Sequence, residues 1–257
     1  MKVIGIIPAR MAATRFPNKP MALIEGMPMI GHCYFRSKMS SLLNEVYVAT
    51  CDQEIFDYIQ SIGGKAIMTS NIHERATERS AEALVKIEKL SGQKFDILVM
   101  IQGDEPLIDP EMINESIKPL LSAENQVSNL MTSLKNLEEA KNSNFVKVVT
   151  NVNGNALYMS REPIPSPTKY NDTIKYHRQL GLIAFSRNAI LKFISLPATT
   201  LEIIESIDMN RFLEHQFPIH MTITNYAADS VDTMEDLQIV NIKMRTDKLY
   251  SEYKLIQ

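Results

Sequence analysis

Val3-Ile4-Gly5-Ile6-Ile7 is an apolar, largely β-branched run near the start of the chain, and Pro8-Ala9-Arg10 follows it directly. A run of this kind predicts a strand that is buried on both faces, as the strands of parallel sheets are. Residues 28–39 then carry apolar side chains three and four positions apart, which predicts a helix, and residues 46–49 form a second short apolar run. Strand, helix and strand in this order predict a βαβ unit and a parallel sheet.

The same alternation continues through the first half of the chain. Asp52 is placed to cap a helix that ends at Gly63-Gly64, and a short strand follows at residues 65–68. A helix is expected over about residues 77–90, and the almost wholly apolar residues 96–101 predict a strand at the centre of the sheet. Asp109-Pro110 marks the start of another helix.

The pattern changes after about residue 125. Short extended stretches then predict mixed or antiparallel pairing, at residues 126–134, 145–152, 156–158 and 180–185. We therefore expect a single α/β domain over residues 1–257, with a mainly parallel sheet flanked by helices and a smaller mixed lobe at about residues 126–222. A last helix begins after Thr233, where Asp236 is placed to complete a capping box.

The composition restricts the classes of function. These 257 residues are 45% hydrophobic, which is enough to bury a large core. The 27 Lys and Arg and 30 Asp and Glu leave a net charge of −3, which argues against nucleic acid or an anionic membrane as a partner. Cys33 and Cys51 lack the spacing of a metal site or a disulfide framework. Because no stretch approaches the roughly 18 apolar residues of a membrane span, we expect a cytoplasmic protein.

The loop after the first strand carries three cations, Arg10, Arg15 and Lys19, among small residues. Open α/β sheets bind ligands beyond the carboxyl ends of their strands, which is where this loop lies in the predicted fold. The three cations can therefore converge on one polyphosphate, because arginine and lysine side chains both bind phosphate oxygens. A solvated basic loop explains the same spacing equally well.

Carboxylates follow the most apolar strand, in Gln102-Gly103-Asp104-Glu105-Pro106. A carboxylate at the end of a buried strand is costly unless it has a partner, and Mg²⁺ prefers oxygen ligands of this kind. Asp104 is the first candidate ligand, and a simple turn before Pro106 is the alternative. Asp232 lies just before the last predicted helix, where an N-cap is the usual role of an aspartate. It becomes a second metal ligand only if it meets Asp104 in space.

Together these motifs resemble one enzyme family. The opening run and the turn at Asp104 are joined by Thr77-Glu78-Arg79, Ser160-Arg161-x-Pro163-Ile164-Pro165 and Val231-Asp232-Thr233-x-Glu235-Asp236-Leu237. In this order, over nearly the whole chain, they resemble the 3-deoxy-manno-octulosonate (Kdo) cytidylyltransferases, or CMP-Kdo synthetases. The resemblance implies a nucleotidyltransferase-type α/β fold whose smaller lobe helps to build a homodimer. It also implies a reaction in which CTP and a sugar acid give a CMP-sugar and pyrophosphate.

The resemblance implies roles for individual residues. Asp104 and Asp232 would hold the catalytic Mg²⁺, and Arg10 and Lys19 would complete the catalytic group. The nucleotide would contact Pro8, Ala9, Arg10, Arg15, Lys19, Thr77, Arg79 and Gln102. The acid substrate would contact Arg161, Arg178, Gln179, Glu205 and Met209. For the two arginines of this last group, an ion pair at an interface is an equally good explanation.

The acceptor half of the pattern departs from the family. Gln179 stands where the family has histidine, Ile183 where it has tyrosine, and Met209 where it has glutamine. An amide replaces a ring donor, an alkyl chain replaces a phenol and a thioether replaces an amide, which removes specific hydrogen-bond geometry from one region. The changes therefore predict that an acid with a different or less polar tail is used better than Kdo. The alternatives are CMP transfer to another acid (an amino-modified Kdo, a nonulosonate-like acid or a phosphonate) and a nucleotide-binding regulator without turnover.

Overall fold

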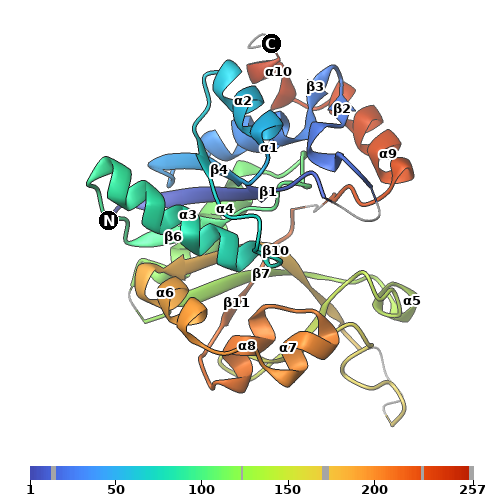
Figure 1. Ribbon diagram of the computed structural model, residues 1–257. Helices are drawn as coiled ribbons and strands as arrows, with labels where there is room; N and C mark the ends of the chain where they lie inside the picture. Colours follow the sequence, from blue (N-terminus) through green and yellow to red (C-terminus); the bar gives the residue numbers. More distant parts are fainter. Residues whose placement is uncertain (13–15, 123, 170–173, 227–228, 255–257) are drawn as a thin grey trace. The chain divides into compact units, whose positions relative to one another are not determined.

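The structure is a computed structural model that describes residues 1–12, 16–122, 124–169, 174–226 and 229–254 (Figure 1). The chain divides into two compact units, one formed by residues 1–114 and 226–257 and the other by residues 115–225. The smaller lobe expected at about residues 126–222 falls within the second of these units. The predicted fold class, an α/β fold with a mainly parallel sheet and a smaller mixed part, is confirmed.

A parallel sheet forms the core of the first unit. Its strands are β1 (Val3–Ala9), β4 (Glu45–Thr50), β5 (Ala66–Met68) and β6 (Ile97–Met100), in the spatial order β6-β1-β4-β5. Each neighbouring pair is parallel, with Ile7 opposite Val48 and Ile6 opposite Met100. The apolar runs therefore form buried strands, as their lack of polar positions predicts.

Helices connect these strands as crossovers. Both α1 (Met29–Lys38) and α2 (Gln53–Ser61) pack against β4, while α3 (Ala76–Ser91) crosses the opposite face and returns the chain to β6 on the far side of β1 (Figure 1). Gly92 ends α3 in the left-handed region, with φ of 67°, where glycine has no steric penalty. The strand order reverses between β1 and β6, and such a switch point is where open α/β sheets bind ligands.

Shorter elements complete the first unit. They are η1 (Lys19–Met21), β2 (Leu23–Ile24), β3 (Met27–Pro28), α9 (Met234–Arg245) and α10 (Tyr250–Tyr253), and α4 (Pro110–Ile117) begins in this unit. The predicted capping box is present at the start of α9: Thr233 Oγ1 accepts from the Asp236 amide, and the Asp236 carboxylate accepts from the Thr233 amide. Among the described residues, no helix combines the length and hydropathy that a membrane span requires.

The second unit has mixed strand pairing. β7 (Val127–Ser133) lies between β11 (His220–Ile223), which is parallel to it, and β10 (His177–Ser186), which is antiparallel. β8 (Lys147–Thr150) pairs antiparallel with β9 (Ala156–Ser160) and meets β10 at Arg178. The remaining elements are η2 (Lys118–Leu120), α5 (Leu137–Ala140), α6 (Arg187–Ser195), α7 (Thr200–Glu205) and α8 (Met209–Glu214).

One local prediction is wrong and another is too short. The strand expected at residues 180–185 is present in β10, but it begins earlier, at His177, because its first residues pair with the end of β7 at Ser133 and Thr132. Asp52 occupies the N-cap position of α2, but its side chain makes no capping bond there. Its Oδ2 instead accepts from the Met11 amide at 2.8 Å, so a carboxylate at the end of β4 holds the loop after β1.

A buried polar network joins the C-terminal helix to α1. His32 is buried and neutral, because desolvation lowers the pKa of its imidazole to about 4. Its Nε2–H donates to the Ile24 carbonyl at 2.8 Å, so its Nδ1 accepts from the Tyr253 hydroxyl, also at 2.8 Å. The Arg36 guanidinium also donates to the Tyr253 oxygen and pairs with Asp247.

We predict that Tyr253→Phe lowers the free energy of unfolding by about 1–2 kcal/mol, because it leaves the buried His32 Nδ1 without its donor. Tyr250→Phe is the matched control, since Tyr250 donates to the Glu25 carbonyl at a half-buried position. Urea unfolding measures both variants. Equal losses in the two would contradict a special role for the buried network.

Candidate active site

A cavity of about 290 Å³ opens at the carboxyl ends of β1 and β6. Seven of the residues predicted to form the site line it: Pro8, Ala9, Arg10, Lys19, Gln102, Asp104 and Asp232. Arg15, which was also predicted, lies outside the described residues. The cavity is at the switch point of the sheet, so the topology brings the loop after β1 and the turn after β6 to one place.

Two backbone features bring Asp104 beside Asp232. A Cβ on Gly103 would lie 3.0 Å from the Pro8 carbonyl oxygen, so the missing side chain lets the turn after β6 approach the end of β1. The Val231 amide then donates to the Asp104 carbonyl at 2.9 Å, which fixes the segment before α9 against that turn. Because Thr233 is the N-cap of α9, the Asp232 carboxylate is not the helix cap.

The ammonium group of Lys19 lies between the two carboxylates. It donates to Asp104 Oδ2 at 2.7 Å and to Asp232 Oδ1 at 3.2 Å. The Lys19 side chain is only 14% exposed, so it is not the solvated loop cation that its sequence position also allows. Burial opposes its charge, but the two aspartates outweigh burial and raise the pKa of Lys19 above its ordinary value.

The loop after β1 is held at its first turn. The Met11 amide donates to Asp52, and the Met11 carbonyl accepts from the Asn18 amide at 3.2 Å. Asn18 itself is left-handed, with φ of 59°, and this turn leads directly into Lys19. Arg10 remains exposed at the rim of the cavity, where a guanidinium can reach a bound anion.

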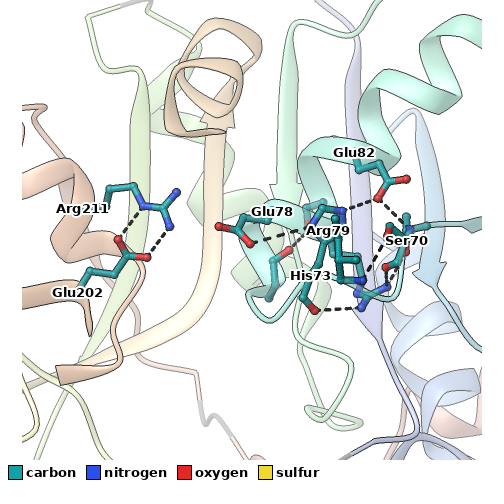
Figure 2. Close-up of polar contacts among 11 residues, drawn as sticks. Ser70, His73, Glu78, Arg79, Glu82, Glu202 and Arg211 are labelled. Atoms are coloured by element: carbon teal, nitrogen blue, oxygen red, sulfur yellow. Dashed lines mark hydrogen bonds and ion pairs between the residues drawn. The ribbon is translucent and has the colours of Figure 1, made fainter. Parts of the chain in front are cut away.

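A second, smaller cavity of about 130 Å³ adjoins the same loop. It shares Pro8, Ala9 and Arg10 with the first cavity and is closed by residues 73–76 and Arg79. Thr77, predicted to lie near the nucleotide, is buried, and its Oγ1 lies 3.8 Å from Met100 Sδ. Arg79 is almost fully buried and donates to Thr69, Ser70 and His73 (Figure 2).

Arg161 and Glu205, which are predicted to contact the acid, are hydrogen-bonded to each other in the second unit, in each case through a side chain of one residue and the backbone of the other. The Arg161 guanidinium donates to the carbonyls of Glu205, Ser143 and Ser206. The Glu205 carboxylate accepts from the Arg161 amide and from Ser160. Lys147, which sequence reasoning missed, is buried and donates to the carbonyls of Asn142, Phe145 and Arg161.

The other acceptor candidates lie on β10 and α8. Arg178 stacks on Phe145, with its guanidinium carbon 4.1 Å from the ring centre. Gln179 donates through Nε2 to Asn129 Oδ1 at 2.7 Å, next to the register shift between Gln179 and Ile183. Met209 is only 1% exposed, and Ile183 is also buried. Two of the three departures from the family pattern are therefore interior apolar side chains.

The two carboxylates beside Lys19 are candidate ligands for a divalent cation. Among the described residues, no group of three or more His, Cys, Asp or Glu side chains is close enough to hold a metal ion. Asp104 and Asp232 nevertheless lie close enough together for both carboxylates to accept hydrogen bonds from the Lys19 ammonium group. Two carboxylates, together with phosphate oxygens of a nucleotide, are the ligand set that Mg²⁺ takes in nucleotide enzymes. The donor chemistry therefore fits Mg²⁺ when a nucleotide supplies the missing ligands.

Comparison with known proteins identifies the family. A family model described as Cytidylyltransferase matches residues 4–223. The 3-deoxy-manno-octulosonate cytidylyltransferase of Geotalea uraniireducens is 40% identical to this chain, over 93% of this chain and 98% of the relative. The chain belongs to the 3-deoxy-manno-octulosonate cytidylyltransferase family. The protein of the same name from Fusobacterium nucleatum is 41% identical to this cytidylyltransferase, over 94% of this chain and 96% of its own.

A solved structure supports the same assignment. The structure of CMP:2-keto-3-deoxy-manno-octonic acid synthetase complexed with CTP has a TM-score of 0.88 and 34% sequence identity with this cytidylyltransferase. The similarity covers 95% of this chain and 99% of that chain. The family resemblance predicted from the motifs is therefore confirmed.

We predict that Lys19→Met lowers turnover with CTP by about 100-fold, because the variant loses the cation that lies between the two aspartates. Cooperative unfolding should persist, since Lys19 lies in a short turn rather than in the sheet. Steady-state pyrophosphate release and urea unfolding measure the two properties. Unchanged turnover would contradict a role for Lys19 in the site.

Proposed function

We propose that this cytidylyltransferase transfers CMP from CTP to the anomeric hydroxyl of Kdo and releases pyrophosphate. The observation that carries the proposal is 40% identity, over 93% of the chain, to a 3-deoxy-manno-octulosonate cytidylyltransferase. The Lys19, Asp104 and Asp232 cluster in the larger cavity supports it, because nucleotidyl transfer needs a cation that binds the triphosphate and oxygen ligands for its metal ion. The expected homodimer remains a prediction.

The proposed chemistry is a displacement at phosphorus. The anomeric oxygen attacks the α-phosphorus, the bond from that phosphorus to the bridging oxygen of the β-phosphate breaks, and the hydroxyl proton passes to solvent. Arg10 and Lys19 bind the triphosphate and neutralise the charge that develops on the departing pyrophosphate. Mg²⁺, held by Asp104 and Asp232, would polarise the phosphoryl oxygens. The protein itself mainly binds and orients the two substrates.

We expect metal dependence if the two carboxylates bind Mg²⁺. We predict that a chelator abolishes pyrophosphate release, that added Mg²⁺ restores it, and that Asp104→Asn lowers turnover at least 100-fold without loss of fold. Asp109→Asn is the control, because Asp109 lies in the same segment but binds the Glu111 amide at the start of α4. Full activity of a folded Asp104→Asn variant would exclude Asp104 as a metal ligand.

A second candidate function is the same transfer to an amino-modified acid. Asn129 Nδ2 donates to the carbonyls of Leu180 and Leu182, which orients its amide and directs its Oδ1 to Gln179. Because Nε2 of Gln179 is engaged with that Oδ1, the other end of this amide is an acceptor. An acceptor at this position favours a ligand that donates a hydrogen bond, and an ammonium group is a stronger donor than a hydroxyl.

Substrate profiling separates the two candidates. Pyrophosphate release is measured with CTP and Kdo, an amino-modified Kdo, a nonulosonate and a phosphonate, and then with Kdo and each of CTP, UTP, ATP and GTP. We expect CTP to be preferred and Kdo to be used, and a higher kcat/KM with the amino-modified acid would establish the second candidate. Equal rates with a purine nucleotide would contradict cytidylyl transfer, and no turnover with any acid would favour a nucleotide-binding regulator.

A further inference from the structure

The loop between β5 and α3, residues 69–75, is held by side chains of α3. This 69–75 loop contains no helix or strand, so contacts outside its own backbone must determine its shape. Arg79 and Glu82 lie three positions apart on α3 and therefore share one face of the helix. Figure 2 shows both side chains directed at Ser70 and His73. We call these two residues the loop clasp.

Arg79 binds the loop through oxygen atoms. It donates from Nη1 to Thr69 Oγ1 at 2.6 Å and to the Ser70 carbonyl at 3.2 Å, and from Nη2 to the His73 carbonyl at 3.4 Å. The residue is 3% exposed, so these bonds are shielded from water and are stronger than they would be at the surface. The guanidinium therefore binds the 69–75 loop, whereas the family resemblance implies a direct contact with the nucleotide.

Glu82 binds the same loop through nitrogen atoms. Its Oε2 accepts from the Ser70 amide at 2.9 Å and from His73 Nε2 at 2.5 Å, and its Oε1 pairs with Lys86 at 2.7 Å. Partial burial opposes ionisation of Glu82, but the bonds from Lys86, Ser70 and His73 outweigh it and lower the pKa of the carboxyl to about 2. The carboxylate is therefore charged throughout the neutral range.

The 69–75 loop forms a wall of the smaller cavity. His73, Glu74 and Arg75 line that cavity from one side, and Pro8, Ala9 and Arg10 line it from the other. The last three also line the larger cavity, where Arg10 and Lys19 supply cations for a triphosphate and the two aspartates supply oxygen ligands for its metal ion. A nucleotide whose phosphates occupy the larger cavity can therefore extend its sugar and base along Arg10 into the smaller one.

We infer that Arg79 and Glu82 are positioning residues that hold the 69–75 loop as the wall against which the nucleoside part of CTP binds. This inference rests on the proposed use of CTP, but not on the identity of the acid. It assigns a role in nucleotide affinity to Glu82, which lines neither cavity, and to Lys86, which ties Glu82 to the end of β5 through the Met68 carbonyl.

The test compares two glutamates of α3. Glu82→Gln removes a carboxylate that accepts from a backbone amide and pairs with a lysine at the loop. Glu88→Gln removes a carboxylate with the same kinds of partner, the Phe95 amide and Lys94, at the other end of the helix. CTP binding is measured by calorimetry without any acid, and steady-state kinetics give KM for CTP, KM for Kdo and kcat.

We expect Glu82→Gln to weaken CTP binding roughly tenfold and to raise KM for CTP equally, because a neutral amide replaces charge-assisted bonds. KM for Kdo and kcat should stay within about twofold of the wild type, and Glu88→Gln should leave CTP binding unchanged. Lys86→Met serves if Glu82→Gln does not fold, since Lys86 is about half exposed, and it should weaken CTP binding in the same direction.

Two outcomes would overturn the inference. The first is that Glu82→Gln, or Lys86→Met, binds CTP with the same affinity as Glu88→Gln. The other is a parallel rise in KM for CTP and for Kdo, which would indicate a general loss of structure. Failure of the proposed acid substrate is a separate result, because CTP binding is measured without the acid.

Discussion

The contact of the Lys19 ammonium with Asp104 and Asp232 is the interaction on which the site of the first unit depends. Two carboxylates placed together repel each other unless a cation lies between them. Lys19 supplies that cation from the loop after β1, while the aspartates come from the turn after β6 and the approach to α9. One charged contact therefore joins three segments that are far apart in the sequence.

The parallel sheet makes this contact possible. Strand order reverses between β1 and β6, so the loops that leave these strands diverge to opposite faces and open a cavity between them. Gly103 permits the close approach of the two segments, and the Val231 amide fixes the third. Asp52, at the end of β4, holds the loop after β1 from the other side. Backbone constraints thus place the charged side chains before any ligand arrives.

Cations have a different role in the second unit. Lys147 and Arg161 both donate to main-chain carbonyls, so their charge organises the loops around β8 and β9. The buried Glu202 and Arg211 pair acts similarly between α7 and α8 (Figure 2). In the same unit, Asn129 sets the orientation of the Gln179 side-chain amide.

The α/β class, the buried strands and the three charged motifs can be predicted from the sequence, because apolar periodicity, capping residues and strand-end carboxylates are local signals. The order of these motifs along the chain also indicates the family. Three partner choices depend on tertiary contacts. Asp232 shares Lys19 with Asp104 instead of capping α9, Asp52 binds Met11 instead of capping α2, and Glu82 with Arg79 holds the 69–75 loop. The physical reason is that a side chain's partner depends on which distant segments the sheet order brings to the same edge. Local spacing carries no information about that.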